Sequence, residues 1–145
     1  MRTVEATVHI NSTTQRALDA FTDPELLRGW WGVERALVEK HVGGVYTLAW
    51  NISKSGFGYV ASGIVRSYEA GKILEIGAFV YLNPERPILG PMTFRVLVEN
   101  ANPGAVVHLT QGGYQDSPDW DWYYDAVKQA WPDVLVQLKN YLEST

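Results

Sequence analysis

Apolar and polar residues alternate along much of the chain with a period of two, which is typical of half-buried β-strands. In residues 3–10 the apolar positions are Val4, Ala6, Val8 and Ile10. Six further segments, separated by clusters of Gly, Asn, Ser and Pro, predict strands near residues 34–41, 44–51, 58–69, 72–82, 91–100 and 104–112. Most of the connections are short, so consecutive strands are expected to pair as antiparallel hairpins.

The phase of the alternation assigns side chains to the two faces of the sheet. Three sets are expected to point inward: Tyr46, Leu48 and Trp50; Met92, Phe94, Val96 and Val98; and Val107, Leu109 and Gln111. Gln111 is the polar member, and a buried amide needs hydrogen-bond partners. It either bonds to the nearby start of the C-terminal helix or contacts a ligand.

Helical spacing replaces the alternation in three places. Residues 11–13 supply capping oxygens for one short helix, and Asp23 with Pro24 begins a second. Residues 117–144 form a long amphipathic helix whose apolar positions recur every three or four residues: Trp120, Tyr124, Val127, Trp131, Val134, Leu135, Leu138 and Leu142. Pro132 lies inside this pattern and is expected to kink or split the helix.

These elements together make an α+β arrangement. A single antiparallel sheet of seven strands must cover one of its faces, and the C-terminal helix carries the only large apolar stripe available for this. We therefore expect a curved sheet wrapped around that helix. Because such a sheet cannot close along the whole length of the helix, the remaining gap is a natural place for a ligand cavity.

Composition and charge narrow the class of protein. The 145 residues are 46% hydrophobic and 19% charged, which is typical of one globular domain. A net charge of −4 does not favour binding to nucleic acid or to an anionic membrane. No apolar run reaches the roughly 20 residues of a membrane span. Because the N-terminal residues do not resemble a signal peptide and there are no cysteines, we expect a cytoplasmic location.

Six tryptophans and eight tyrosines are unusual for this length. Several are expected to point at the same helix, where they would line an amphipathic pocket, although simple core packing is the alternative for each. The expected ligand-binding residues are Trp30, Trp31, Tyr46, Trp50, Tyr59, Phe79, Tyr81, Phe94, Gln111, Tyr124, Val127 and Trp131. On the C-terminal helix, Tyr124 is the favoured pocket residue, and Trp131 is interpreted as an anchor beside Pro132.

The sequence indicates no catalytic or metal-ligating group. His9 and His108 fall on the expected outer faces of their strands, and two histidines without a third ligand do not define a metal site. No Ser, His and Asp have the spacing of a catalytic triad. Residues 56–58 (GFG) lack the third glycine of a phosphate-binding loop and are interpreted as a hairpin turn. We therefore expect neither a metal nor an organic cofactor.

Segments along the whole chain resemble one known family. They are 21–31 (FTDPELLRGWW), 42–46 (VGGVY), 63–65 (GIV), 70–74 (AGKIL), 109–112 (LTQG) and 130–143 (AWPDVLVQLKNYLE). They are similar to motifs of the heat-shock-protein-90 ATPase activator homologue-like proteins, a branch of the helix-grip superfamily. The resemblance implies one START/SRPBCC-like domain over residues 1–145. Its fold would be a curved seven-stranded antiparallel sheet, two short helices after the first strand, and a long C-terminal helix on the concave face.

Four positions depart from the family's usual residues. Glu39 and His41 stand where Asp and Arg usually precede the double glycine, and Ala130 replaces a usual Gly. Gln111 stands where a His is often found, which removes an acid–base group from the mouth of the expected cavity. The changes before the double glycine and at Gln111 weaken a catalytic interpretation.

The favoured hypothesis is a small-molecule-binding protein that holds an apolar or aromatic ligand between the sheet and the C-terminal helix. The resemblance also implies two alternatives: a cofactor-free enzyme of the polyketide cyclase or dehydratase type, and a co-chaperone that stimulates a heat-shock-protein-90 ATPase. A chaperone partner is the least expected, because the chain has no long charged arm or second module. An open edge strand would be able to support a homodimer.

Overall fold

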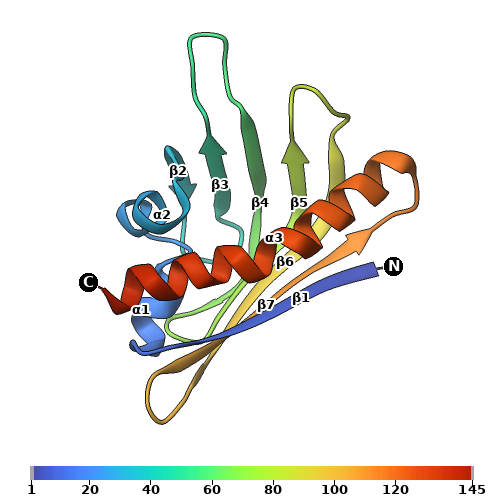
Figure 1. Cartoon of the computed structure of the whole chain (residues 1–145). Coiled ribbons are helices and arrows are strands. Elements are labelled where there is room, and N and C mark those ends of the chain that lie inside the picture. Colours follow the sequence, from blue (N-terminus) through green and yellow to red (C-terminus); the bar gives the residue numbers. More distant parts are fainter. Residues whose placement is uncertain (1, 145) are drawn as a thin grey trace.

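The computed structural model describes residues 2–144, which form seven strands and three helices (Figure 1). The elements are β1 (Arg2–Ile10), α1 (Thr14–Asp19), α2 (Pro24–Trp31), β2 (Arg35–Val38), β3 (Val45–Trp50), β4 (Tyr59–Glu69), β5 (Ile73–Leu82), β6 (Leu89–Asn100), β7 (Ala105–Tyr114) and α3 (Pro118–Glu143). Every element expected from the sequence is present. The strand expected near 34–41 is shorter and covers only Arg35–Val38. It ends there because the chain turns after Glu39, where the His41 amide donates a hydrogen bond to the Glu39 carbonyl.

The strands form one antiparallel sheet in the order β1-β7-β6-β5-β4-β3-β2. The six strands from β2 to β7 are consecutive hairpin neighbours, as expected, and β1 pairs with β7 at the other end of the chain. Figure 1 shows α3 lying across one face of this sheet, while α1 and α2 connect β1 to β2 near the C-terminal end of α3. The architecture is the α+β helix-grip arrangement predicted from the sequence.

Irregular pairing between β4 and β5 helps the sheet to bend. The register shifts between Ser62 and Ile64 and again between Val65 and Ser67. A Cβ at Gly63 would lie 2.5 Å from the Ile76 side chain, so only glycine allows the strands to approach so closely here. On β5, Ala78 has a φ of 48°, which alanine rarely adopts. Bulges of this kind increase local bend and twist, which favours a sheet that curves around α3.

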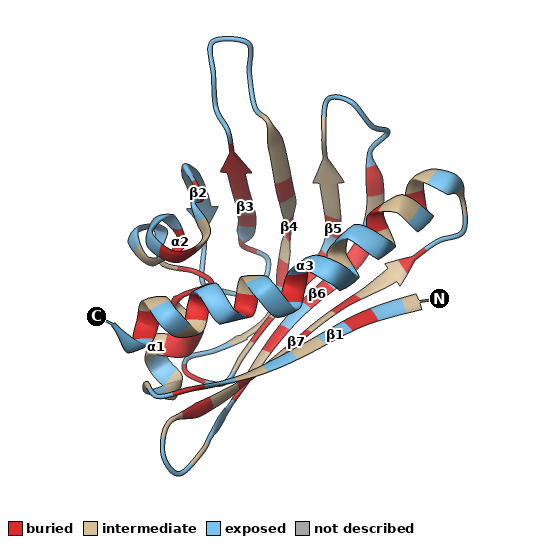
Figure 2. Cartoon of the chain, viewed as in Figure 1, coloured by how far each residue is buried: buried red, intermediate tan, exposed pale blue. Residues whose placement is uncertain are grey.

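The inner face of the sheet and one side of α3 form the core (Figure 2). On β6, the expected inward set from Met92 to Val98 is at most 3% exposed. Tyr46 and Leu48 on β3 and Leu109 on β7 are 1% exposed, which confirms the faces assigned from the alternation. The apolar stripe of α3 meets this surface through Trp131, Leu135, Leu138 and Leu142, all buried.

Helix α3 begins as the sequence predicts and continues past its proline. Ser117 caps the helix by accepting a hydrogen bond from the Trp120 amide at 3.3 Å, and Pro118 occupies the first turn. Of the two outcomes expected at Pro132, a kink or a split, the split does not occur. The buried residues on both sides of Pro132 keep the helix on the sheet despite the lost backbone hydrogen bond. Within residues 2–144, no helix combines the length and apolar character needed to cross a membrane.

Candidate functional site

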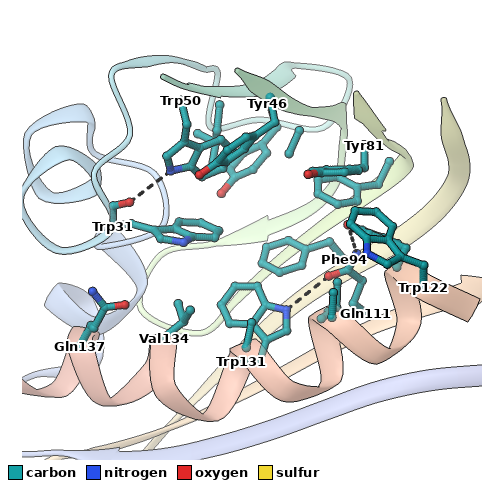
Figure 3. Close-up of a pocket in the computed structure, with 18 residues that line it drawn as sticks. Trp31, Tyr46, Trp50, Tyr81, Phe94, Gln111, Trp122, Trp131, Val134 and Gln137 are labelled. Atoms are coloured by element: carbon teal, nitrogen blue, oxygen red, sulfur yellow. Dashed lines mark hydrogen bonds between the residues drawn. The ribbon is translucent and has the colours of Figure 1, made fainter. Parts of the chain in front are cut away.

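A cavity of about 440 Å³ lies between α3 and the inner face of the sheet (Figure 3). Aromatic and aliphatic side chains make up most of its wall. The lining residues are Trp31, Tyr46, Leu48, Trp50, Tyr59, Ala61, Phe79, Tyr81, Phe94, Gln111, Trp122, Tyr123, Ala126, Val127, Ala130, Trp131, Val134 and Gln137. The cavity therefore occupies the position expected from incomplete closure of the sheet around the helix.

One wall of the cavity comes from inward-facing residues of the sheet. Tyr46 and Trp50 lie four residues apart on β3, so they share a face, and Phe94 comes from β6. Figure 3 shows the rings of Tyr46 and Trp50 on one side of the hollow and Trp131 and Val134 of α3 on the other. Two elements far apart in sequence thus face each other across the space.

The opposite wall comes from two neighbouring rows of residues along α3. Side chains three or four positions apart lie side by side on a helix, which explains the lining positions 122, 126, 130 and 134, and 123, 127 and 131. Ala126 and Ala130 are exposed to solvent at the rim of the cavity. Their small side chains leave space that a larger residue would fill.

Helix α2 places Trp31 at one end of the cavity. Asp23 caps this helix by accepting a hydrogen bond from the Glu25 amide, and the helix ends at Gly32, whose φ of 71° suits glycine. The Trp31 carbonyl accepts a hydrogen bond from Trp50 Nε1 at 3.1 Å. The centroid of the Trp31 ring lies 5.3 Å from that of Trp131. Trp31 therefore joins α2 to both β3, through Trp50, and α3, through Trp131.

Gln111 links the polar groups of two other residues in the cavity wall. Its side chain is 3% exposed, and its Nε2 donates to the Tyr123 hydroxyl at 3.0 Å. Trp131 Nε1 donates to Gln111 Oε1 at 3.4 Å, and Nε2 also lies 3.6 Å from Met92 Sδ. Gln111 therefore bonds to two side chains of α3, those of Tyr123 and Trp131. Of these, Tyr123 lies nearer the start of the helix, where a hydrogen-bond partner for Gln111 was expected.

No Asp, Glu, His, Lys or Arg is among the lining residues of the described chain. Burial raises the pKa of Tyr46 and Tyr123 well above that of an exposed phenol; at Tyr123 the hydrogen bond from Gln111 opposes this, and the nearby Tyr81 adds to it. The Tyr46 hydroxyl donates to the Phe21 carbonyl at 2.8 Å. The cavity wall therefore carries no charged side chain, and burial favours the protonated form of Tyr46 and Tyr123.

Two of the residues expected in the pocket lie elsewhere. Trp30 is buried in the core, where its Nε1 donates to the Ala20 carbonyl at 2.7 Å. Tyr124 points away from the cavity, with the Arg2 guanidinium carbon 4.6 Å from its ring centroid and Tyr114 beside it. The cause is the helical step of about 100° per residue, which turns Tyr123 inward and Tyr124 outward. The other ten expected residues line the cavity.

Eight lining residues were not predicted from the sequence: Leu48, Ala61, Trp122, Tyr123, Ala126, Ala130, Val134 and Gln137. Leu48 and Val134 had been placed on inward faces without being assigned to the pocket. Continuing the four-residue steps from Val134 back through Ala130 and Ala126 to Trp122 would have found one complete row. Gln137 carried no such signal, because its polar side chain does not belong to the apolar pattern of the helix.

The histidines form no metal site among residues 2–144, where no cluster of three or more His, Cys, Asp or Glu side chains occurs. His9 Nε2 lies 2.6 Å from the Pro103 carbonyl. His108 lies on β7 opposite Thr7, with its Nδ1 3.3 Å from the threonine hydroxyl and its Nε2 3.7 Å from Glu99. Both histidines therefore belong to the outer surface of the sheet.

Several solved structures share this fold. Protein MLL2253 from Mesorhizobium loti matches with a TM-score of 0.78 and 21% identity, over 99% of this chain and 98% of that one. The Aha1 dimer from Colwellia psychrerythraea matches with a TM-score of 0.70 and 16% identity, over 99% and 97%. DynU16, a protein from the dynemicin biosynthetic locus, matches with a TM-score of 0.72 and 15% identity, over 98% of this chain and 47% of that one.

The sequence itself has one family match. No curated protein matches it significantly. The model of the family described as "Activator of Hsp90 ATPase homolog 1-like protein" matches residues 12–143, which include all three helices and the last six strands. The chain therefore belongs to the family of Activator of Hsp90 ATPase homolog 1-like proteins.

Proposed function

We propose that this protein binds a neutral, apolar or aromatic small molecule in the cavity between the sheet and α3. The observation that carries the proposal is the cavity of about 440 Å³ with a mostly aromatic, uncharged wall. This volume lies within the range of about 300–1,000 Å³ that is usual for small-molecule sites. A few polar groups in an apolar wall are also typical of such sites, because they orient a ligand that burial holds.

Burial of apolar surface would supply most of the binding free energy. At about 25 cal/mol per Å², removing about 300 Å² of apolar ligand surface from water contributes about 7 kcal/mol. Part of this gain is offset by the lost translational and rotational freedom of the ligand. A free energy of about 7 kcal/mol alone corresponds to a Kd of about 10 μM. After the offset we expect a Kd of about 100 μM or weaker for such a ligand, with tighter binding as its apolar area increases.

Catalysis is less well supported than binding. A cyclase or dehydratase needs a group that accepts a proton, and a carboxylate or histidine usually fills this role. Within the described residues, the cavity wall offers only phenol, indole and amide groups, and burial raises the pKa of Tyr46 and Tyr123. Such groups can donate hydrogen bonds to a ligand, but at neutral pH they are poor bases.

Filling the cavity from its rim tests the proposal without disturbing the core. Ala130 lines the cavity, whereas Gln129, the preceding residue of α3, does not; both are exposed. We expect the wild-type protein to enhance the fluorescence of the neutral dye N-phenyl-1-naphthylamine at a saturable site. We expect Ala130→Phe to weaken dye binding by about tenfold or more, since the added ring takes up space needed by the ligand.

Gln129→Phe is the matched control, because it adds a similar ring one residue away on the same helix. It should bind the dye with the wild-type affinity. Absence of dye binding to the wild-type protein, or equal binding by the two variants, would contradict the cavity as the ligand site. Circular dichroism on both variants establishes that the fold is retained.

A further inference from the structure

The orientation of the Gln111 amide follows from the chemistry of its neighbours. An indole N–H can only donate, so Trp131 Nε1 requires the carbonyl oxygen of the amide, and the two atoms lie 3.4 Å apart. The Nε2 group then faces the Tyr123 hydroxyl at 3.0 Å. With the opposite orientation, the indole N–H would face an NH₂ group, and two donors would meet.

This orientation determines the role of the Tyr123 hydroxyl. Because an amide NH₂ is a donor, the Tyr123 oxygen accepts the bond from Gln111. Its own proton is therefore not used in that bond. Within the described part of the chain, the Tyr123 hydroxyl forms no hydrogen bond other than this one. Tyr123 also lines the cavity, so the free donor belongs to the wall that a ligand would meet.

The other polar groups of the wall differ from Tyr123 in this respect. Tyr46 donates its proton to the Phe21 carbonyl, and Trp50 Nε1 donates to the Trp31 carbonyl. The Tyr81 hydroxyl accepts a bond from Asn83 Nδ2 at 3.4 Å, much as Tyr123 does from Gln111. Unlike Tyr123, however, the side chains of Trp31, Tyr59, Tyr81 and Trp122 are only half-buried, so water can serve their donors. Tyr123 is 7% exposed. A donor shielded from water gains more from a ligand acceptor than a hydrated one, because it has no other partner to give up.

We propose that Tyr123 is the specificity-determining hydrogen-bond donor of the cavity and that its ligand is a neutral aromatic molecule bearing a carbonyl oxygen. Gln111 acts as a positioning residue, because it holds the phenol oxygen as an acceptor and so leaves the proton for the ligand. This inference rests on the proposed ligand-binding function and adds the chemical class of the ligand. Burial keeps the phenol protonated by raising its pKa, so the donor persists at neutral and mildly alkaline pH.

A matched pair of probes separates this donor from general apolar binding. Fluorene and 9-fluorenone have nearly the same shape, and the ketone adds a carbonyl oxygen. Their affinities are measured by displacement of N-phenyl-1-naphthylamine. We expect Tyr123→Phe to weaken binding of 9-fluorenone by about three- to tenfold, the effect of one net hydrogen bond, and to change fluorene binding by less than about twofold.

Tyr114→Phe is the control variant. Tyr114 belongs to the same buried aromatic cluster, with its ring 5.7 Å from that of Tyr123, but it does not line the cavity. Its substitution should leave both affinities unchanged. If both probes bind the wild-type protein and Tyr123→Phe weakens neither or both equally, the inference about Tyr123 is overturned while ligand binding stands. If neither probe displaces the dye, the ligand class proposed here is wrong, and dye binding still reports on the cavity.

The positioning role of Gln111 is tested by the ratio of the two affinities. Gln111→Leu should lower the preference for 9-fluorenone over fluorene by at least about twofold, because the phenol is no longer held in one orientation. A loss of packing alone would weaken both probes equally and leave the ratio unchanged. That second result would overturn the positioning role.

Discussion

At the scale of single residues, Tyr46 and Tyr114 show how differently two buried phenols contribute to stability. Both side chains are 1% exposed. The Tyr46 hydroxyl donates to the Phe21 carbonyl at 2.8 Å, whereas the Tyr114 hydroxyl has no hydrogen-bond partner within residues 2–144. A buried polar atom without a partner loses its hydration and gains nothing in return.

The two phenols should therefore respond in opposite directions to loss of the hydroxyl. We expect Tyr114→Phe to raise the free energy of unfolding by about 1 kcal/mol, and Tyr46→Phe to lower it by about 1–2 kcal/mol, because the Phe21 carbonyl is then left unpaired. Urea unfolding followed by circular dichroism measures both changes. Destabilisation by Tyr114→Phe would indicate that its hydroxyl does have a partner, such as a buried water.

The sequence alone does not determine whether Tyr123 or Tyr124 lines the cavity. Tyr123 and Tyr124 are adjacent aromatic residues on α3, and the apolar stripe of the helix is wide enough to include either. Which one enters the cavity depends on the rotation of the helix about its axis, which is determined by contacts with the sheet. The free proton of Tyr123 depends in turn on Gln111 and Trp131, from two different elements, so no local pattern reveals it.

At the scale of elements, the loop between β5 and β6 is attached to the first turns of α3 at one end of the cavity. The Arg86 guanidinium carbon lies 3.9 Å from the centroid of the Trp122 ring, and the Arg86 guanidinium is 3.6 Å from the Asp119 carboxylate. Trp122 itself lines the cavity. The loop therefore restrains one of the rings that a ligand would pass or contact.

Release of this restraint should change the rate of ligand exchange more than stability. We expect Arg86→Ala to raise the dissociation rate of N-phenyl-1-naphthylamine by about threefold or more in stopped-flow displacement. The free energy of unfolding should fall by less than about 1 kcal/mol, as is usual for an exposed cation–π contact. Lys54→Ala, in the exposed β3–β4 loop, is the control; equal dissociation rates for both variants would contradict a role for the Arg86 contact.

The elements themselves were predictable because their patterns are local. Strand β6 alternates strictly, and α3 repeats its apolar residues every three to four positions, so both follow from the sequence. The exceptions depend on distant contacts. Pro132 was expected to kink or split α3; the helix is not split, and buried residues on each side of the proline keep it on the sheet. The bend of the sheet is favoured by the irregular backbone at Gly63 and Ala78. The sequence of β4 or β5 alone does not predict this irregularity, because it depends on contacts between the two strands.

At the scale of the whole molecule, the cavity results from how far α3 stands from the sheet. Alternation predicts which residues face inward, but the space between them depends on the curvature of seven strands and on small residues such as Ala61 and Ala126. The aromatic content of the sequence therefore predicted that the cavity has an aromatic wall, but it did not predict the volume of the cavity.

Buried tyrosines make the fold sensitive to alkali. Burial raises the pKa of Tyr46, Tyr114 and Tyr123 in the folded protein, whereas the unfolded chain releases these protons near pH 10. Their contribution to stability is thus fully present below pH 10 and is lost as the pH rises through the folded-state values. Each tyrosine lowers the free energy of unfolding by up to about 1.4 kcal/mol per pH unit above pH 10.

Together the three residues would remove about 4 kcal/mol per pH unit, enough to unfold a domain of ordinary stability within a few units. We therefore expect constant affinity for 9-fluorenone from pH 5 to 9, followed above pH 11 by loss of the far-UV circular dichroism together with a cooperative rise in tyrosinate absorbance at 295 nm. If all tyrosines ionised while the circular dichroism was retained, these hydroxyls would have to reach water in the folded state. An affinity that changed between pH 5 and 9 would instead require a charged group at the ligand site, which the uncharged wall of the cavity does not supply.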